Sequence, residues 1–339
     1  MDTLVEHRIF LLIFVFFTMG LEPDLPGTDG LPLRLVRSSS MADTETGINS
    51  YNCNNVAQNI KLTFESGENN INTEDKSQCK KICLIEAAEY GCVIQIMNLL
   101  SRNADLNVTD SKGNTALMGA AGEGRTEVAK ILLEKGINVN ARNETGWSAL
   151  LIAAIRENNS DISKLLIENG ANQSVTDENG WSPLIWTVYQ GEIDTAKLMI
   201  EKGADLNVKD KFDGWSALIL AIYLGKTDMS KLLIEKGADL NVIDKDGRSA
   251  LIWAVDKREN DTAKLLIEKG AELNIKENNG WCALIWAINK NRSDTAKLLI
   301  EHGAELDVTD EKGWSALILA IYNGRIDTAK LLIEKGANL

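Results

Sequence analysis

The stretch that decides the fold is residues 214–223, Gly-Trp-Ser-Ala-Leu-Ile-Leu-Ala-Ile-Tyr, followed by residues 231–242, Lys-Leu-Leu-Ile-Glu-Lys-Gly-Ala-Asp-Leu-Asn-Val. It recurs, barely altered, from about residue 78 to the C-terminus. The spacing is 33 or 34 residues, as shown by the glycines that open the copies: Gly113, Gly146, Gly180, Gly214, Gly247, Gly280 and Gly313. A period of this length is typical of a stacked array whose units cannot bury their apolar faces alone.

Each copy predicts two short helices. The apolar residues of 216–224 recur on one side of a helix, and residues 228–236 predict a second helix. Gly225 and Gly237 follow these two segments, and glycine commonly ends a helix. Helices of about nine residues are unstable in isolation, so we expect stability to come cooperatively from stacking on neighbouring copies.

At these residues the sequence resembles the ankyrin-repeat family. The family consensus has a glycine, a Thr-Pro-Leu-His-like tetrapeptide opening a first helix, a second helix, and a Gly-Ala-Asp-x-Asn segment that leads into a hairpin. The resemblance covers roughly three quarters of the chain and implies an α-solenoid of stacked antiparallel helix pairs with β-hairpin fingers. We expect about eight repeats, at residues 78–110, 111–143, 144–177, 178–211, 212–244, 245–277, 278–310 and 311–339.

The copies depart from the family pattern in three ways. Residues such as Met118 and Ile219 replace the family's histidine, so we expect apolar contacts to carry more of the stacking. Extra residues around 156–161 and 209–213 are expected to lie in loops, which leaves the helices free to stack. The last copy lacks the polar outer face typical of a terminal repeat. This favours a truncated gene model, a splice form or an end that contacts another chain, and we expect its last helix to fray.

The N-terminal part of the chain differs in composition from the repeats. Residues 9–19 form an apolar run that is short for a transmembrane helix and typical of a signal-peptide core, although Asp2 and Glu6 lie in the usually positive start. Two interpretations stay open: residues 1–40 are a signal peptide or membrane anchor, or Met41 is the start of a cytoplasmic protein. Residues 41–77 are acidic and rich in asparagine, which predicts a disordered linker before the repeat domain, 78–339.

The five cysteines favour the cytoplasmic interpretation. Cys282 occupies a position that sister copies fill with serine, which predicts a packing residue without a partner. An odd number of cysteines with no repeating framework is not typical of a disulfide scaffold. Cys79, Cys83 and Cys92 lack a nearby histidine and a fourth ligand, so we predict no metal site.

Several function classes are disfavoured. The two histidines, His7 and His302, lie in no arrangement that would activate a nucleophile. Phosphate-binding and dinucleotide-binding glycine motifs are absent, as is His-Glu-x-x-His. We therefore expect no enzyme activity, no cofactor and no small-molecule substrate. A net charge of −13, with lysines alternating with acidic residues, predicts no nucleic-acid surface.

Large aromatic residues recur at fixed positions of the repeat. Five tryptophans follow the opening glycine at the base of the finger: Trp147, Trp181, Trp215, Trp281 and Trp314. Three tyrosines share a position near the end of the first helix, which by family resemblance faces the concave groove: Tyr189, Tyr223 and Tyr322. Three more tryptophans lie three residues before that position: Trp186, Trp253 and Trp286. These rings either bind a partner, as aromatic hot spots do, or pack against neighbouring repeats.

The resemblance implies a protein-binding adaptor or scaffold that takes an unidentified protein or peptide on its concave face and fingers. One alternative is a secreted or membrane-tethered effector directed by residues 9–19. Another is a regulatory fragment of a longer multidomain protein. The partner itself is not predicted, because one fold serves many unrelated functions.

Overall fold

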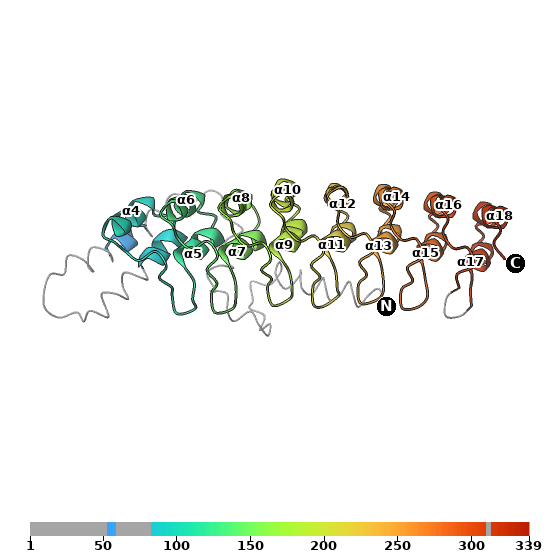
Figure 1. The fold of residues 1–339 in the computed structure, drawn as a ribbon, viewed down its shortest axis with the longest axis horizontal. Helices are drawn as coiled ribbons and strands as arrows, with labels where there is room; N and C mark the ends of the chain where they lie inside the picture. Colours follow the sequence, from blue (N-terminus) through green and yellow to red (C-terminus); the bar gives the residue numbers. More distant parts are fainter. Residues whose placement is uncertain (1–52, 59–82, 310–312, 339) are drawn as a thin grey trace. The chain divides into compact units, whose positions relative to one another are not determined.

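The computed structural model describes residues 53–58, 83–309 and 313–338. From residue 83 onward the chain forms helices that come in pairs along the sequence, joined by loops (Figure 1). A separate short helix covers residues 53–58. The described residues are therefore helical, as expected for an α-solenoid.

The two helices of a pair differ in length and position. The first helices are at 83–89, α5 (Ala116–Gly122), α7 (Ala149–Ile155), α9 (Pro183–Gln190), α11 (Ala217–Tyr223), α13 (Ala250–Lys257), α15 (Ala283–Asn289) and α17 (Ala316–Tyr322). The second helices are α4 (Val93–Ser101), α6 (Thr126–Glu134), α8 (Ser160–Glu168), α10 (Ile193–Glu201), α12 (Thr227–Glu235), α14 (Asn260–Glu268), α16 (Ser293–Glu301) and α18 (Ile326–Glu334).

Local sequence explains the ends of these helices. The Ser216 hydroxyl accepts a hydrogen bond from the backbone N–H of Ile219 at 3.4 Å, which satisfies a donor at the start of α11. Gly225 and Gly237 follow α11 and α12 with φ of 66° and 88°, a left-handed geometry that suits glycine. The same capping bond opens other first helices, from Thr115, Ser148, Ser182, Ser249 and Ser315.

Stacking of neighbouring pairs builds the core. Each first helix from α5 to α15 packs on the next first helix, and each from α5 to α17 packs on the second helix of its own pair. The second helices contact one another in the same order (Figure 1). Leu218 and Leu233 are 1% and 0% exposed between these layers. Burying one such side chain contributes about 1.5 to 3 kcal/mol, so neighbouring repeats hold helices that are too short to persist alone.

The loops that precede the first helices form the fingers. Within the described fingers, pairing is limited to isolated antiparallel bridges, such as Ile243 with Ser249, and no strand forms. The β-hairpin fingers are thus not confirmed. Acidic side chains bond the finger backbone instead, because Asp244 Oδ1 accepts hydrogen bonds from the N–H groups of Asp246 and Arg248 at 2.9 and 2.8 Å.

The two one-residue insertions, expected around 156–161 and 209–213, lie in loops, as the sequence predicts. Residues 156–159 separate α7 from α8, whereas only 123–125 separate α5 from α6. In the finger before α11 the bridge joins Lys209 to Ser216, one residue further apart than Ile243 and Ser249. Stacking continues past both insertions, since α7 packs on α9 and α9 packs on α11.

Asparagine side chains add polar contacts between repeats. Asn207 Oδ1 accepts a hydrogen bond from the backbone N–H of Asp239 at 2.9 Å, and Asn241 Oδ1 accepts one from Glu272 at 2.8 Å. Equivalent bonds join Asn107 to Asn138, Asn140 to Asn172, Asn274 to Glu305 and Asp307 to Asn338. Apolar contacts are therefore not the only stacking interaction. These asparagine and aspartate side chains also connect repeats that lack the family's histidine.

The structure corrects the interpretation of the cysteines. Cys53 and Cys92 form a disulfide that ties the 53–58 helix to the residue preceding α4. The pairing follows from no repeated framework, and its partners are 39 residues apart, so spacing could not reveal it. Cys92 is consequently not a metal ligand. Cys282 has a free, buried thiol, as expected of a packing residue, while Cys79 lies outside the described residues.

Other expectations fall outside the described ranges or stay untested. The segment 1–40 with its signal-peptide and anchor interpretations, most of the linker 41–77 and the repeat start at residue 78 lie outside them. Within the linker, the expectation of disorder is wrong for residues 53–58, which form a helix held by the Cys53–Cys92 disulfide. The repeat boundaries stay predictions. None of the helices in the described part of the chain is long and apolar enough to cross a membrane.

The last helix pair differs from the inner pairs in burial. Ile318 and Ile321 on α17 are 47% and 63% exposed, whereas their equivalents on α11, Ile219 and Ile222, are fully buried at 0%. The difference arises because the stacking side of α17 meets no further described repeat. Fraying of α18 stays a prediction.

Candidate functional site

Three positions of the repeat bring aromatic side chains together. The first lies two residues before the first helix, and the others are the fourth and seventh residues of that helix, as Trp181, Trp186 and Tyr189 illustrate for α9. We refer to the aromatic residues at these positions as the aromatic surface. Its members are Trp147, Trp181, Trp215, Trp281, Trp314, Trp186, Trp253, Trp286, Tyr189, Tyr223 and Tyr322.

The three rings of α9 and its finger form one cluster, which we refer to as the α9 cluster. The ring centroids of Trp181 and Trp186 are 4.6 Å apart. Tyr189 lies edge-on to both, at 5.7 Å from Trp181 and 5.9 Å from Trp186. These separations are typical of favourable aromatic contacts. All three side chains are partly exposed, so the cluster is open to solvent.

The next cluster, referred to as the α11 cluster, spans two repeats. Trp215 contacts Tyr223 with ring centroids 4.5 Å apart, and both contact Trp253 of α13 at 5.4 Å. Trp215 and Trp253 are each only 3% exposed, whereas Tyr223 is partly exposed. For Trp215 this burial favours the packing interpretation over a direct partner contact.

The remaining predicted residues lie at both ends of this series. Trp281 contacts Trp286 at 5.2 Å, and Trp314 contacts Tyr322 at 4.9 Å. Tyr322 is 73% exposed and is the most accessible ring of the aromatic surface. Trp147 is partly exposed. The structure thus brings Trp181, Trp215 and Trp314 each against the tyrosine of its own repeat, while Trp281 contacts Trp286.

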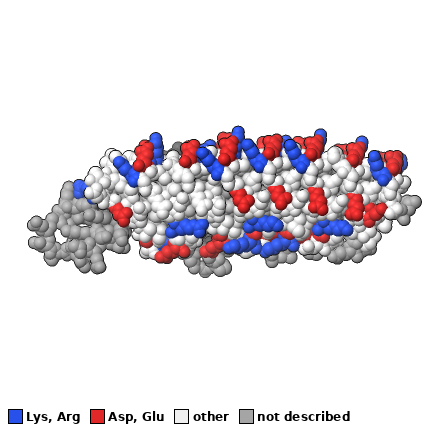
Figure 2. All heavy atoms as spheres, viewed as in Figure 1, with Lys and Arg blue, Asp and Glu red and all other residues white. Residues whose placement is uncertain are grey.

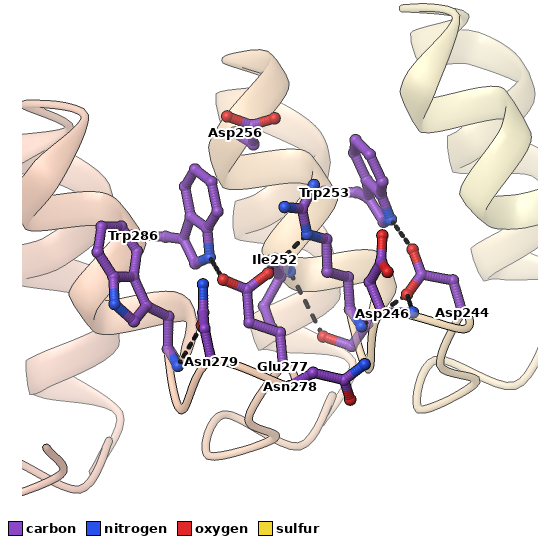
Figure 3. A network of polar contacts seen from close by, with 12 residues as sticks. Asp244, Asp246, Ile252, Trp253, Asp256, Glu277, Asn278, Asn279 and Trp286 are labelled. Atoms are coloured by element: carbon purple, nitrogen blue, oxygen red, sulfur yellow. Dashed lines mark hydrogen bonds and ion pairs between the residues drawn. The ribbon is translucent and has the colours of Figure 1, made fainter. Parts of the chain in front are cut away.

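Buried acidic residues hold the helix tryptophans in place. The indole Nε1–H of Trp253 donates to Asp244 Oδ2 at 2.8 Å, and that of Trp286 donates to Glu277 Oε1 at 3.0 Å (Figure 3). Trp186 makes the same bond to Asp177, at 3.1 Å. Sequence reasoning missed these acids. The signal was a carboxylate nine residues before each helix tryptophan.

Arg248 replaces the finger tryptophan in the α13 repeat and connects two clusters. Its guanidinium lies 5.0 Å from the ring centroid of Trp253 and 5.2 Å from that of Trp286. Its Nε donates to Glu277 Oε2 at 2.6 Å. Glu277 therefore binds an indole with one oxygen and an arginine with the other (Figure 3). The cation–π contacts add attraction between neighbouring repeats.

The comparison with protein families agrees with this architecture. The model described as "Ankyrin repeats (3 copies)" matches residues 49–143, 139–210, 207–277 and 273–339. The chain belongs to the ankyrin-repeat family. A comparison with curated proteins found no match.

Burial and nearby charges shift the pKa values of the ionisable groups beside the aromatic surface. Burial raises the pKa of Asp177 and of Asp244, and the hydrogen bonds from backbone and indole groups offset part of that rise. Burial alone would lower the pKa of Arg248, but the nearby carboxylates of Glu277, Asp244 and Asp246 raise it overall. The arginine therefore remains charged between the two indoles.

Two lysines of the ankyrin array also sit on aromatic rings. Lys257 Nζ lies 4.1 Å from the Tyr223 centroid and 5.6 Å from that of Trp253. Lys290 Nζ lies 5.0 Å from the Trp286 centroid and 2.8 Å from Asp256 Oδ1. In the middle repeats the array's own cations thus cover part of the aromatic surface.

Among the described residues, no group of three or more His, Cys, Asp or Glu side chains could hold a metal ion. The exposed ring of His302 contacts the Leu298 carbonyl at the end of α16, and His7 lies outside the described residues. The aromatic surface presents ring area to solvent, and buried carboxylates lie beneath it.

Proposed function

We propose that this ankyrin array is an adaptor or scaffold that binds a protein or peptide partner along its aromatic surface. The observation that carries the proposal is the row of partly exposed rings beside the fingers, led by the α9 cluster and by Tyr322. Tryptophan and tyrosine are the residues most enriched in interface hot spots. Their indole and phenol groups combine a large apolar area with a polar atom.

The repeat architecture supports this role. We infer an array of about eight repeats, with the fingers and first helices lining its concave binding face. Stacked repeats present side chains at regular intervals on a surface that does not need to reorganise on binding. Trp186 is fixed by its bond to Asp177, so this ring loses little conformational freedom when a partner docks.

The proposal assigns this chain no catalysis, cofactor, nucleic acid or small-molecule substrate. The net charge of −13 opposes phosphate binding. On the face seen in Figure 2, acidic and basic side chains lie beside one another, which disfavours binding to a polyanion.

Affinity capture with the full chain tests the proposed role. We expect the native protein to retain a reproducible partner, and the variant Trp181→Ala/Tyr189→Ala/Tyr322→Ala to bind it at least about thirtyfold more weakly, since a single hot-spot ring contributes about 2 kcal/mol or more. The matched control changes Met97 and Ile193 to Ala, because these side chains are 48% and 40% exposed on second helices. Equal capture by the aromatic variant, or loss of capture by the control, would contradict the proposal.

A second candidate is a secreted or membrane-tethered ankyrin effector, and the Cys53–Cys92 disulfide favours it. Disulfides persist in oxidising compartments and are rare in the cytosol. We expect protein recovered from expressing cells to carry this disulfide and to begin near Leu21. Peptide mass mapping under non-reducing conditions checks both, with the free Cys282 thiol as the control for alkylation after unfolding. Reduced Cys53 and Cys92 in a chain beginning at Met41 would instead support the cytoplasmic interpretation.

A further inference from the structure

We propose that the α9 cluster, Trp181, Trp186 and Tyr189, binds a lysine side chain of a partner protein. This inference rests on the proposed function, because it names the chemical group that the aromatic surface takes at one place. A lysine ammonium is attracted to the faces of aromatic rings within about 6 Å of their centroids, and rings that are open to solvent are free to accept one from another molecule.

The neighbouring α11 cluster is an internal example of such binding. It also contains two tryptophans and a tyrosine at similar separations, although its second tryptophan, Trp253, belongs to the following repeat. The chain's own Lys257 places its ammonium 4.1 Å from the Tyr223 centroid. This lysine comes from the repeat that follows Tyr223. An ammonium group therefore fits against a cluster of two tryptophans and a tyrosine in this array.

Internal cations also contact the equivalent positions one repeat further on. Lys290 extends from the next repeat to within 2.8 Å of Asp256, which occupies the position of Tyr223 in the α13 repeat. Arg248 covers both Trp253 and Trp286. From α11 to α15 the array thus supplies cations to its own aromatic and acidic positions.

The α9 cluster differs in lacking an internal cation. The position equivalent to Lys257 and Lys290 is Leu224 in the repeat that follows α9. Among the residues that the structure describes, no lysine or arginine lies over Trp181, Trp186 or Tyr189. The α9 cluster therefore shares the finger tryptophan and the helix tyrosine of the filled α11 cluster, takes its second tryptophan from its own helix, and has an apolar residue where the chain's own lysine would be.

Negative charge around the cluster complements a cation. Asp177 accepts the indole hydrogen bond of Trp186, so a carboxylate lies at the edge of the cluster. Burial of the phenol raises the pKa of Tyr189, and the negative charge of the exposed Glu157 raises it further. A lysine that docks here keeps contact with water through the open side of the rings, which limits its desolvation.

The indole signals of the full-length protein test this inference. All eight tryptophans belong to the aromatic surface, so nitrogen–proton correlation spectra report each part of it separately. The probe is the blocked tripeptide acetyl-Gly-Lys-Gly-amide, and the comparison peptide replaces lysine with uncharged norleucine. We expect saturable shifts of the Trp181 and Trp186 signals with the lysine peptide, and little change for Trp253 and Trp286, whose faces hold internal cations.

A substitution in the chain makes the test sharper. Leu224→Lys places a lysine where sister repeats have one, so it should fill the α9 cluster and weaken binding of the lysine peptide by about fivefold or more. Leu224→Met keeps an apolar side chain of similar size and should bind as the native protein does. Circular dichroism checks that both variants are folded.

Equal shifts with the norleucine peptide, no shifts at all, or unchanged binding by Leu224→Lys would overturn the lysine assignment. These failures are distinguishable from failure of the adaptor role. A partner that is captured by the native chain and lost by the Trp181→Ala/Tyr189→Ala/Tyr322→Ala variant, yet retained by Leu224→Lys, would leave the adaptor role standing without a lysine.

Discussion

Trp215→Ala is expected to lower the free energy of unfolding by about 3 to 5 kcal/mol, the usual effect of truncating a buried tryptophan. The side chain is only 3% exposed and contacts Tyr223 in its own repeat and Trp253 in the next. Its removal leaves a cavity between two repeats, so the stacking interaction weakens together with the local packing. Urea unfolding followed by circular dichroism measures the change.

Trp181→Ala is the matched control, because Trp181 occupies the same position one repeat earlier. Its side chain is partly exposed, and both of its ring contacts lie within its own repeat. We expect a clearly smaller loss of stability, since less apolar area returns to water and solvent can occupy the vacated space. Similar losses for the two variants would show that burial does not separate packing tryptophans from accessible ones.

Glu277→Ala should destabilise the protein by about 3 kcal/mol, because it removes the hydrogen-bonded carboxylate of the largely buried Arg248 and leaves Asp244 and Asp246 as its nearest acidic groups. The side chains of Glu277 and Arg248 are 2% and 14% exposed, and Nε of Arg248 lies 2.6 Å from Oε2 of Glu277. The substitution also removes the acceptor of the Trp286 indole. Urea unfolding of this variant, of Arg248→Ala and of the double variant forms a double-mutant cycle that isolates the pair.

We expect the double variant to lose less stability than the sum of the two single variants, since removing both charges leaves neither unpaired. The pair Lys264 and Glu268 serves as the control: it is 3.8 Å apart on α14, with side chains 63% and 50% exposed. Glu268→Ala should change stability by no more than about 0.5 kcal/mol. Additive losses at Glu277 and Arg248 would refute a coupled network.

Much of the fold was predictable from the sequence because helix capping and apolar spacing act within a single repeat. Ser216 marks where α11 begins, and Gly225 and Gly237 follow the ends of α11 and α12. The extra residues near 156–161 and 209–213 were expected in loops and lie there. The sequence also predicted where the aromatic residues lie in the repeat, since each recurs at a constant position.

Other features depend on contacts that no local pattern reports. Three finger acids, Asp177, Asp244 and Glu277, accept hydrogen bonds from indoles nine residues later and are 4% to 6% exposed, and the sequence analysis did not identify them. The Cys53–Cys92 disulfide joins segments on either side of residues outside the described ranges. In the described fingers, pairing is limited to isolated bridges, and the Asp244 side chain accepts hydrogen bonds from backbone N–H groups of its finger.

The sequence by itself determined the helix pairs, the ankyrin repeat and the positions of the aromatic residues, because period, capping and apolar spacing act within one unit of 33 or 34 residues. Only the tertiary structure decided which rings are buried and which stay open. Trp215 and Trp181 share one sequence position, yet Trp253 of the following repeat packs on Trp215, while Trp181 has its ring contacts within its own repeat. The role of a ring in this array depends on its neighbour in the next repeat, and stacking alone brings the two together.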